Sequence, residues 1–193
     1  MKVAKRKWAG VVTAALVAVL AAPASATTLI RASLDHLTDG NGTVVVGEVV
    51  DAYSYWNEDG TFILTDVRVA VNERLKGKLD DGELTVTIMG GTVGDLTTLI
   101  VGGAELIPEH SYVLFLDEED LPGARGVRTV RDHCQGVFEV EIAEDGLRAV
   151  SQANGHPLLP DASGAFDAPG GAEGFPLEAM IETIRERADV HRR

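Results

Sequence analysis

Three residue types that take part in catalysis stand side by side at Asp132, His133 and Cys134. A cysteine becomes a nucleophile when a histidine that is close in space removes its proton. The neighbouring sequence is typical of β-strands, and adjacent side chains on a strand point to opposite faces of the sheet. We therefore expect no catalytic residue here. The alternative is an exported enzyme whose site is assembled from dispersed residues near Asp132 and His133.

Cys134 is the single cysteine of the 193-residue chain, so an intramolecular disulfide is impossible. An odd cysteine in an exported protein can pair between chains, react, or lie buried. Free cysteines are among the most buried residue types, and we expect Cys134 to be a buried, unreactive thiol.

Metal and cofactor motifs are absent from the sequence. No two of the five histidines have the spacing that places two ligands on one helical face. The segment that begins at Asp39 has Val44 where a calcium loop needs glycine. Gly90-Gly91-Thr92-Val93-Gly94 lacks the Lys-Ser/Thr of a phosphate-binding loop. We predict neither a metal nor a cofactor.

The first 26 residues have the three parts of a secretory signal peptide. A basic start is followed by an uncharged stretch from Trp8 to Ala22, and the small residues Ala24-Ser25-Ala26 come next. The uncharged stretch is shorter than the roughly 20 residues of a membrane-spanning helix. We expect cleavage before Thr27 and a secreted or periplasmic protein, with an uncleaved membrane anchor as the alternative.

Cleavage would make an acidic chain more acidic. Residues 1–26 hold four of the 17 Lys and Arg and none of the 30 Asp and Glu, so the net charge would change from −13 to −17. Affinity for nucleic acid rests on basic residues that neutralise phosphates. Neither nucleic acid nor an anionic membrane is therefore an expected partner of the cleaved chain.

The rest of the chain is predicted to be mainly β. Runs rich in valine, isoleucine and threonine, separated by clusters of glycine, asparagine and aspartate, predict strands. These runs cover 43–50, 61–75, 83–89, 111–116, 127–130, 136–142 and 147–150, with a strand or extended loop at 97–101. Ser33 is placed to cap a short helical turn. The acidic run Asp117–Asp120 is predicted to be a solvated loop, with weak binding of a divalent cation as the alternative.

Two strands should form a hairpin on opposite sides of the polar turn 76–82. Their alternating apolar residues are expected to face one interior, with Thr85 and Thr87 facing outward. The inward residues are Val67, Val69 and Val71 on one strand and Leu84, Val86 and Ile88 on the other. Phe62 and Leu64 have the other parity, which predicts a β-bulge near Thr65-Asp66.

A Gly-, Pro- and Ala-rich stretch separates the last strand from a C-terminal helix. We expect a signal peptide at 1–26, a β-domain at 27–153, a linker at 154–174 and a helical segment at 175–193, with the helix itself at about 176–188. Its apolar stripe has helical spacing and consists of Leu177, Met180, Ile181 and Ile184. The stripe should dock on the β-domain, and the alternative is an exposed partner-binding helix.

Short apolar motifs resemble a known group of proteins. They occur in the order 45–50, 67–69, 75–77, 90–94 and 112–116. This succession resembles a group of exported bacterial β-barrel proteins of uncharacterised function. More distantly, it is similar to the OB-fold domains of netrin modules and of tissue inhibitors of metalloproteinases. The resemblance implies a small OB-like antiparallel barrel with a C-terminal amphipathic helix.

The resemblance also implies a function. Tissue inhibitors bind the zinc of a protease through the amine and carbonyl of an N-terminal cysteine; here Thr27-Thr28 would stand at the cleaved terminus, without the family's stapling cysteines. A free α-amino group can coordinate zinc whatever side chain follows. The signal peptide, the compact β pattern and the lack of a catalytic constellation lead us to expect an exported, non-enzymatic protein-binding module, inhibitor-like in its narrower form. Its partner is expected to be another exported protein. The candidate partner-binding residues are Thr27, Thr28, Gly90, Gly91 and Thr92.

Overall fold

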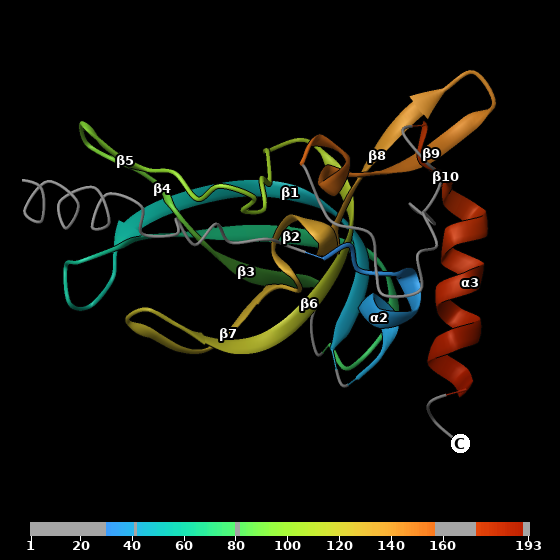
Figure 1. The fold of residues 1–193 in the computed structure, drawn as a ribbon, viewed down its shortest axis with the longest axis horizontal. Coiled ribbons are helices and arrows are strands. Elements are labelled where there is room, and N and C mark those ends of the chain that lie inside the picture. The colour runs from blue at the N-terminus through green and yellow to red at the C-terminus, as the bar shows by residue number, and fades with distance from the viewer. Residues whose placement is uncertain (1–29, 41, 80–81, 157–172, 191–193) are drawn as a thin grey trace, which may run out of the picture.

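The fold is known from a computed structural model that describes residues 30–40, 42–79, 82–156 and 173–190. It is mainly β, as predicted, with an antiparallel sheet and a C-terminal helix (Figure 1). The strands are β1 (Thr43–Trp56), β2 (Ile63–Lys76), β3 (Glu83–Met89), β4 (Gly91–Val93), β5 (Leu96–Thr98), β6 (Ser111–Leu121), β7 (Ala124–Val130), β8 (Val137–Ala143), β9 (Gly146–Ser151) and β10 (Phe175–Pro176). The helices are α2 (Leu34–Thr38) and α3 (Leu177–Val190), with short 3₁₀ turns η1 (His133–Gly136) and η2 (Gln152–Gly155).

The large sheet is built around β1. On one side of β1 the chain forms the meander β1–β2–β3; on the other side lies β6. The first half of β6 pairs with β8 and its second half pairs with β7. The sheet curls until β3 and β7 contact each other, but no ladder of hydrogen bonds joins them. We call this contact between β3 and β7 the seam. Because no hydrogen-bond ladder crosses the seam, the sheet is not a closed barrel.

The inner face of the curled sheet holds the first hydrophobic core. Val67 and Val69 of β2 pack there with Leu84 and Val86 of β3, as their alternation predicts. Val71 and Ile88 are partly buried against the same core. The three large residues that β6 contributes are Tyr112, Leu114 and Leu116.

The outer face of the β1–β2–β3 meander carries a polar network across three strands. The hydroxyl groups of Tyr55 and Thr87 both donate to Asp66 Oδ1, at 3.1 and 2.7 Å. Thr87 therefore lies on the face opposite Val86, as expected, but is buried rather than exposed. The hydrogen bonds to a charged carboxylate explain how its hydroxyl tolerates burial.

The predicted bulge at Thr65-Asp66 is wrong. Both residues pair regularly with β1, and the register of the β1–β2 pair shifts elsewhere, including at Val50 of β1. Ile63, Leu64 and Thr65 are all buried, so both faces of β2 are covered at its beginning. The change of parity in the sequence therefore reflects burial on two faces and not an inserted residue.

The predicted acidic loop is also wrong. Asp117–Asp120 belong to β6, which pairs with β7 as far as Leu121. Glu118 lies opposite Arg128, and their charged groups are 3.8 Å apart. Charged side chains are tolerated on this strand because they are exposed to solvent.

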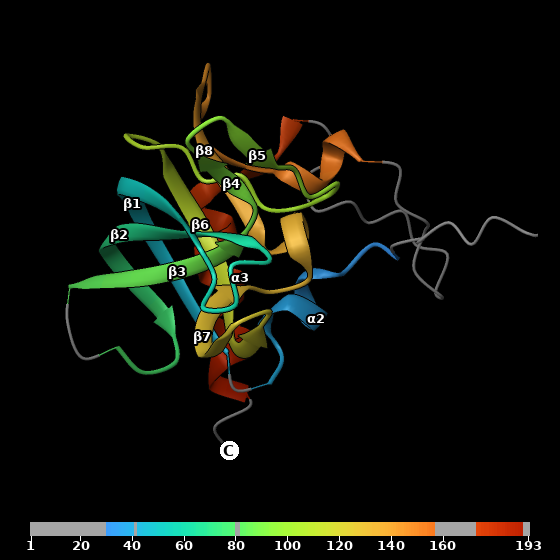
Figure 2. The ribbon, with the colours of Figure 1, turned by 90° about the vertical axis from the view of Figure 1, so that its left-hand side faces the viewer.

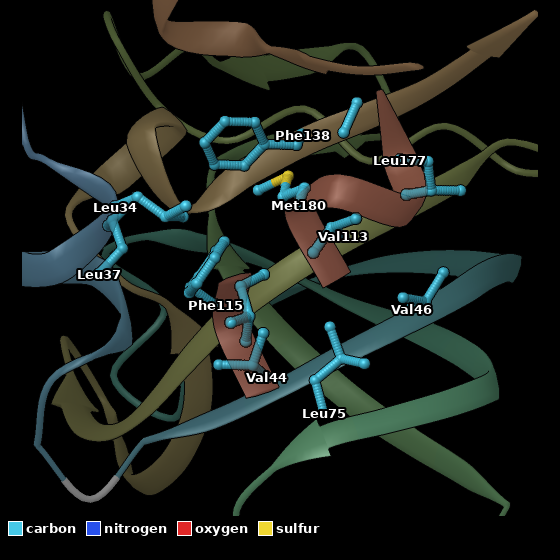
Figure 3. Packing of buried hydrophobic residues seen from close by; sticks show 12 residues of the cluster. Leu34, Leu37, Val44, Val46, Leu75, Val113, Phe115, Phe138, Leu177 and Met180 are labelled. Atoms are coloured by element: carbon cyan, nitrogen blue, oxygen red, sulfur yellow. The ribbon is translucent and has the colours of Figure 1, made fainter. Parts of the chain in front are cut away.

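The second core lies between the outer face of the sheet and the two helices (Figure 3). Phe115 of β6 and Phe138 of β8 meet edge to face with ring centroids 5.7 Å apart, and Met180 of α3 packs beside them. Leu34 and Leu37 of α2 join the same core. The docking of the C-terminal helix is thus confirmed.

α3 buries a stripe of residues spaced three and four apart: Leu177, Met180, Ile184 and Ala188. Ile181 is only partly buried. The helix begins at Leu177 and not earlier, because Phe175 and Pro176 pair with β9 as β10. In the described part of the chain, no helix has the length and apolar character needed to cross a bilayer.

The turns and the helices lie at opposite ends of the molecule. The β1–β2 turn, the β6–β7 turn and the β4–β5 hairpin gather at one end, and α2 and α3 stand at the other (Figures 1 and 2). Asn57 ties two of the turns together: its side chain accepts from the Thr61 and Phe62 amides and donates to the Pro122 carbonyl.

Candidate functional site

The chain turns sharply just after β7. Asp132 and His133 both have left-handed backbones, with φ of 52° and 60°. η1 follows at once, and a Cβ on Gly136 would lie 2.5 Å from the Arg131 carbonyl oxygen. The expectation that these residues lie on a strand is therefore wrong. Such backbone outliers cost about 1–3 kcal/mol each and cluster at functional sites.

An open pocket of about 190 Å³ lies at the seam beside this turn. We call it the seam pocket. Its walls come from the two seam strands, from the end of β6, from segment 100–104 and from the turn after β7. The lining residues are Ile88, Met89, Ile100, Gly103, Ala104, Glu119, Leu121, Thr129, Val130, Asp132 and His133. Pockets for cofactors and other small molecules usually measure about 300–1,000 Å³, so the seam pocket suits a single side chain better.

The lining of the seam pocket contains two carboxylates and neither lysine nor arginine. Asp132 Oδ2 lies 2.9 Å from His36 Nε2 and 3.7 Å from Arg131 Nε, which compensates part of its charge. Glu119 is exposed. On the same strand pair Arg128 contacts Glu118 rather than Glu119. The pocket therefore presents a net negative charge at neutral pH.

Cys134 is fully buried and is not part of the pocket lining. Its amide donates to the Gly102 carbonyl at 3.2 Å. Burial raises the pKa of the thiol above its ordinary value, which disfavours the nucleophilic thiolate. The predicted burial of Cys134 is confirmed. Among the residues that the structure describes, no cluster of histidine, cysteine and carboxylate side chains could hold a metal ion.

Exposed apolar side chains border the seam pocket on one side. Leu99 is 79% exposed and Val101 is 90% exposed, and Ile100 between them lines the pocket. We call Leu99 and Val101 the apolar bank. The sequence predicted only a strand or extended loop at 97–101, although an apolar run directly before Gly102-Gly103 was a usable indication of this surface. Exposed apolar groups beside a pocket are typical of interaction sites.

The glycine loop predicted to contact a partner has a structural role in this fold. Gly90 and Gly91 have φ of 97° and 124°, and a Cβ on Gly91 would overlap the Ser54 and Thr65 hydroxyls. Thr65 Oγ1 in turn donates to the Gly90 carbonyl at 2.7 Å. The loop therefore packs its backbone onto the ends of β1 and β2, directly after the pocket residues of β3.

Thr92, by contrast, is exposed. Its hydroxyl lies 2.9 Å from that of Thr97 on the facing strand of the β4–β5 hairpin. The other two candidate partner-binding residues, Thr27 and Thr28, lie outside the described residues.

The N-terminal segment that would follow Thr27-Thr28 is held against η1. The side-chain carboxamide of Gln135 accepts from the Ala32 amide at 2.6 Å and donates to the Ile30 carbonyl at 3.0 Å. Gln135 is 5% exposed, and its carboxamide pairs with the backbone much as a strand would. The start of the described chain is therefore anchored close to the turn that lines the seam pocket.

A second hollow, an open groove of about 910 Å³, lies at the beginning of β1 and the end of β2. It mixes both signs of charge, and its charged lining residues are Lys76, Lys78, Arg128, Asp117, Glu118 and Glu119. Lys76 donates to the Thr38 and Gly40 carbonyls, and burial lowers its pKa. Much of this charge is internally compensated, so the groove indicates no particular ligand.

No family model matches the chain, and no curated protein matches it.

Proposed function

We propose that the cleaved chain is an exported, non-enzymatic protein-binding module built on an OB-like sheet. The OB-fold is a five-stranded, partly open barrel. Five strands support the comparison: β1, β2 and β3 form a meander, β6 pairs with β1, β7 pairs with β6, and the curl brings β7 against β3. The partner is another exported protein.

One observation carries the proposal: two exposed apolar side chains, the apolar bank, flank a lining residue of the seam pocket along the chain. Ile100 contributes to the pocket while its neighbours Leu99 and Val101 are exposed to solvent. Protein interfaces combine apolar anchors in pockets with near-neutral contacts around them. Here the seam pocket can receive an anchor of the partner, and the apolar bank supplies contacts beside it. The volume of the pocket fits one side chain of a partner rather than a free cofactor.

The test compares two double variants of the chain 27–193. Leu99→Ser with Val101→Ser removes the apolar bank and should reduce partner capture from the exported fraction at least tenfold. Ile142→Ser with Leu147→Ser removes two exposed apolar residues from the β8–β9 hairpin and serves as the matched control. Equal capture by both variants, or no capture by the unmodified chain, contradicts the proposal. Unchanged melting temperatures show that both variants are folded.

Export and the inhibitor-like form of the proposal concern the N-terminus. N-terminal sequencing of secreted protein should give Thr27, and an intact Met1 in the membrane fraction contradicts cleavage. If the α-amine of Thr27 binds the zinc of a protease, the cleaved chain should inhibit that protease. A variant with one extra N-terminal methionine should then inhibit at least tenfold less.

One observation favours the second candidate, an exported enzyme: Asp132 and His133 both line the seam pocket. Such an enzyme would lose turnover in both Asp132→Asn and His133→Asn. Loss of an activity in these variants, with full activity in Cys134→Ala, would favour the enzyme over the binding module.

A further inference from the structure

We infer that the seam pocket takes a lysine or arginine side chain of the partner. This inference rests on the proposed function and specifies the chemistry of the residue that the partner contributes. The pocket lies at the seam and not on the outer face of the β1–β2–β3 meander.

The size of the pocket fits one long side chain. Its volume is about 190 Å³, and a cavity of about 150 Å³ holds one benzene molecule. The side chain of lysine or arginine is of similar size. A whole cofactor is too large for this space.

The lining also fits a chain with an apolar stem and a cationic end. Ile88, Met89 and Ile100 provide apolar wall, while Glu119 and Asp132 provide carboxylates. Lysine and arginine bury their methylene stems along apolar surface and keep the charged group in a polar environment. The pocket offers both environments within one side-chain length.

Charge complementarity separates this occupant from the others. The lining contains no lysine or arginine, and the chain as a whole has a net charge of −13. A partner carboxylate would be repelled by Glu119 and Asp132. A leucine or norleucine would fill the same volume but would desolvate the carboxylates without pairing them, which is unfavourable. Of the two carboxylates in the lining, Arg131 and His36 contact Asp132 and not Glu119, so Glu119 should dominate the selectivity.

The test uses four blocked pentapeptides in which leucines flank a central lysine, arginine, norleucine or glutamate. Binding to the chain 27–193 is followed by amide chemical shifts at Ile88 and Ala104 in the pocket and at Leu99 and Val101 in the apolar bank. The lysine or arginine peptide should shift the pocket amides and bind at least tenfold more tightly than the norleucine peptide. The advantage should shrink in high salt.

Two variants assign the selectivity to one carboxylate. Glu119→Gln should remove most of the advantage of the lysine peptide over the norleucine peptide. Glu118→Gln is the matched control, because Glu118 is the adjacent acidic residue, contacts Arg128 and lies outside the pocket lining. This control should leave the advantage unchanged.

The outcomes separate the inference from the proposed function. If all four peptides bind equally and shift only Leu99 and Val101, the basic side chain is wrong and the binding surface stands. Tighter binding of the norleucine or glutamate peptide would likewise contradict the basic side chain and leave the binding surface in place. If no peptide shifts any of these amides, and the apolar-bank variant still captures the partner fully, the inference and the proposed function are both wrong.

Discussion

Gln135 and Ala32 are joined by a 2.6 Å hydrogen bond, from the Ala32 amide to the Gln135 side-chain oxygen, across 103 residues of sequence. The same side chain donates to the Ile30 carbonyl. One buried carboxamide thus connects the N-terminal segment to the turn that lines the seam pocket.

Gln135→Ala should lower the free energy of unfolding by about 1–3 kcal/mol, because it leaves two backbone groups without their partner. Urea unfolding measures this loss. Gln152→Ala is the matched control, since Gln152 makes the same pair of bonds to the Glu105 backbone at an exposed position. Equal losses in the two variants would contradict the role assigned to Gln135.

Ile184→Ala should cost about 2–5 kcal/mol, because Ile184 is fully buried between α3 and the sheet. Ile181→Ala, on the same helix but only partly buried, should cost less than about 2 kcal/mol. Thermal or urea unfolding of both variants checks the order. A reversed order would mean that α3 docks with a different face.

Gly91→Ala should lower stability by about 2–6 kcal/mol, because the new Cβ is strained at a φ of 124° and overlaps the Ser54 and Thr65 hydroxyls. Gly94→Ala is the control: its φ is also positive, at 60°, but no atom lies within 4 Å of the new Cβ. It should cost about 1–2 kcal/mol. Similar losses would mean that the loop does not pack closely on β1 and β2.

Stability should fall in alkaline solution, and Tyr55 should contribute to the fall. Burial and the neighbouring Asp66 raise the pKa of Tyr55 above its ordinary value of 10.0. A raised pKa in the folded state means that the stabilisation is complete below about pH 10 and is lost as the pH rises through the folded-state pKa. Burial also raises the pKa of Tyr112, which acts in the same direction.

Tyr55→Phe should therefore flatten the decline of unfolding free energy above about pH 10. Denaturant unfolding at several pH values measures the slope. Tyr53→Phe is the control, since Tyr53 stacks on Tyr55 but is 71% exposed. An unchanged slope in Tyr55→Phe would show that the bond to Asp66 does not govern the alkaline transition.

Cys134 should react with a thiol reagent much more slowly in the native protein than in denaturant, because it is fully buried and its pKa is raised by burial. Cys134→Ala should leave peptide and partner binding intact. Labelling at the denatured rate under native conditions would mean that η1 opens readily.

Local pattern was sufficient for most of the secondary structure. Alternation at Val67, Val69, Leu84 and Val86 determines which face of the hairpin is buried, because side chains on a strand alternate between faces. Helical spacing likewise determines the buried stripe of α3. The burial of Cys134 followed from its residue type, because free cysteines are among the most buried residues.

Tertiary structure decided where the pattern had two explanations. Apolar residues of both parities at the start of β2 indicated a bulge, but the residues are buried because both faces of the strand are covered. The acidic run in β6 resembled a loop, yet pairing with β7 supplies its backbone hydrogen bonds while its charges remain in water. Local sequence does not encode which distant strand covers a face or pairs an edge.

The candidate site was beyond the sequence for the same reason. The pocket is lined by four separate segments of the chain, which contribute Ile88, Ile100, Glu119 and Asp132. Only the curl of the sheet brings these segments together. The sequence by itself determined most of the strands, most of the buried stripes and the acidic charge, because these depend on residue type and spacing. The seam, its pocket and the left-handed turn at Asp132 and His133 depend on packing between distant segments, and therefore only the tertiary structure decided them.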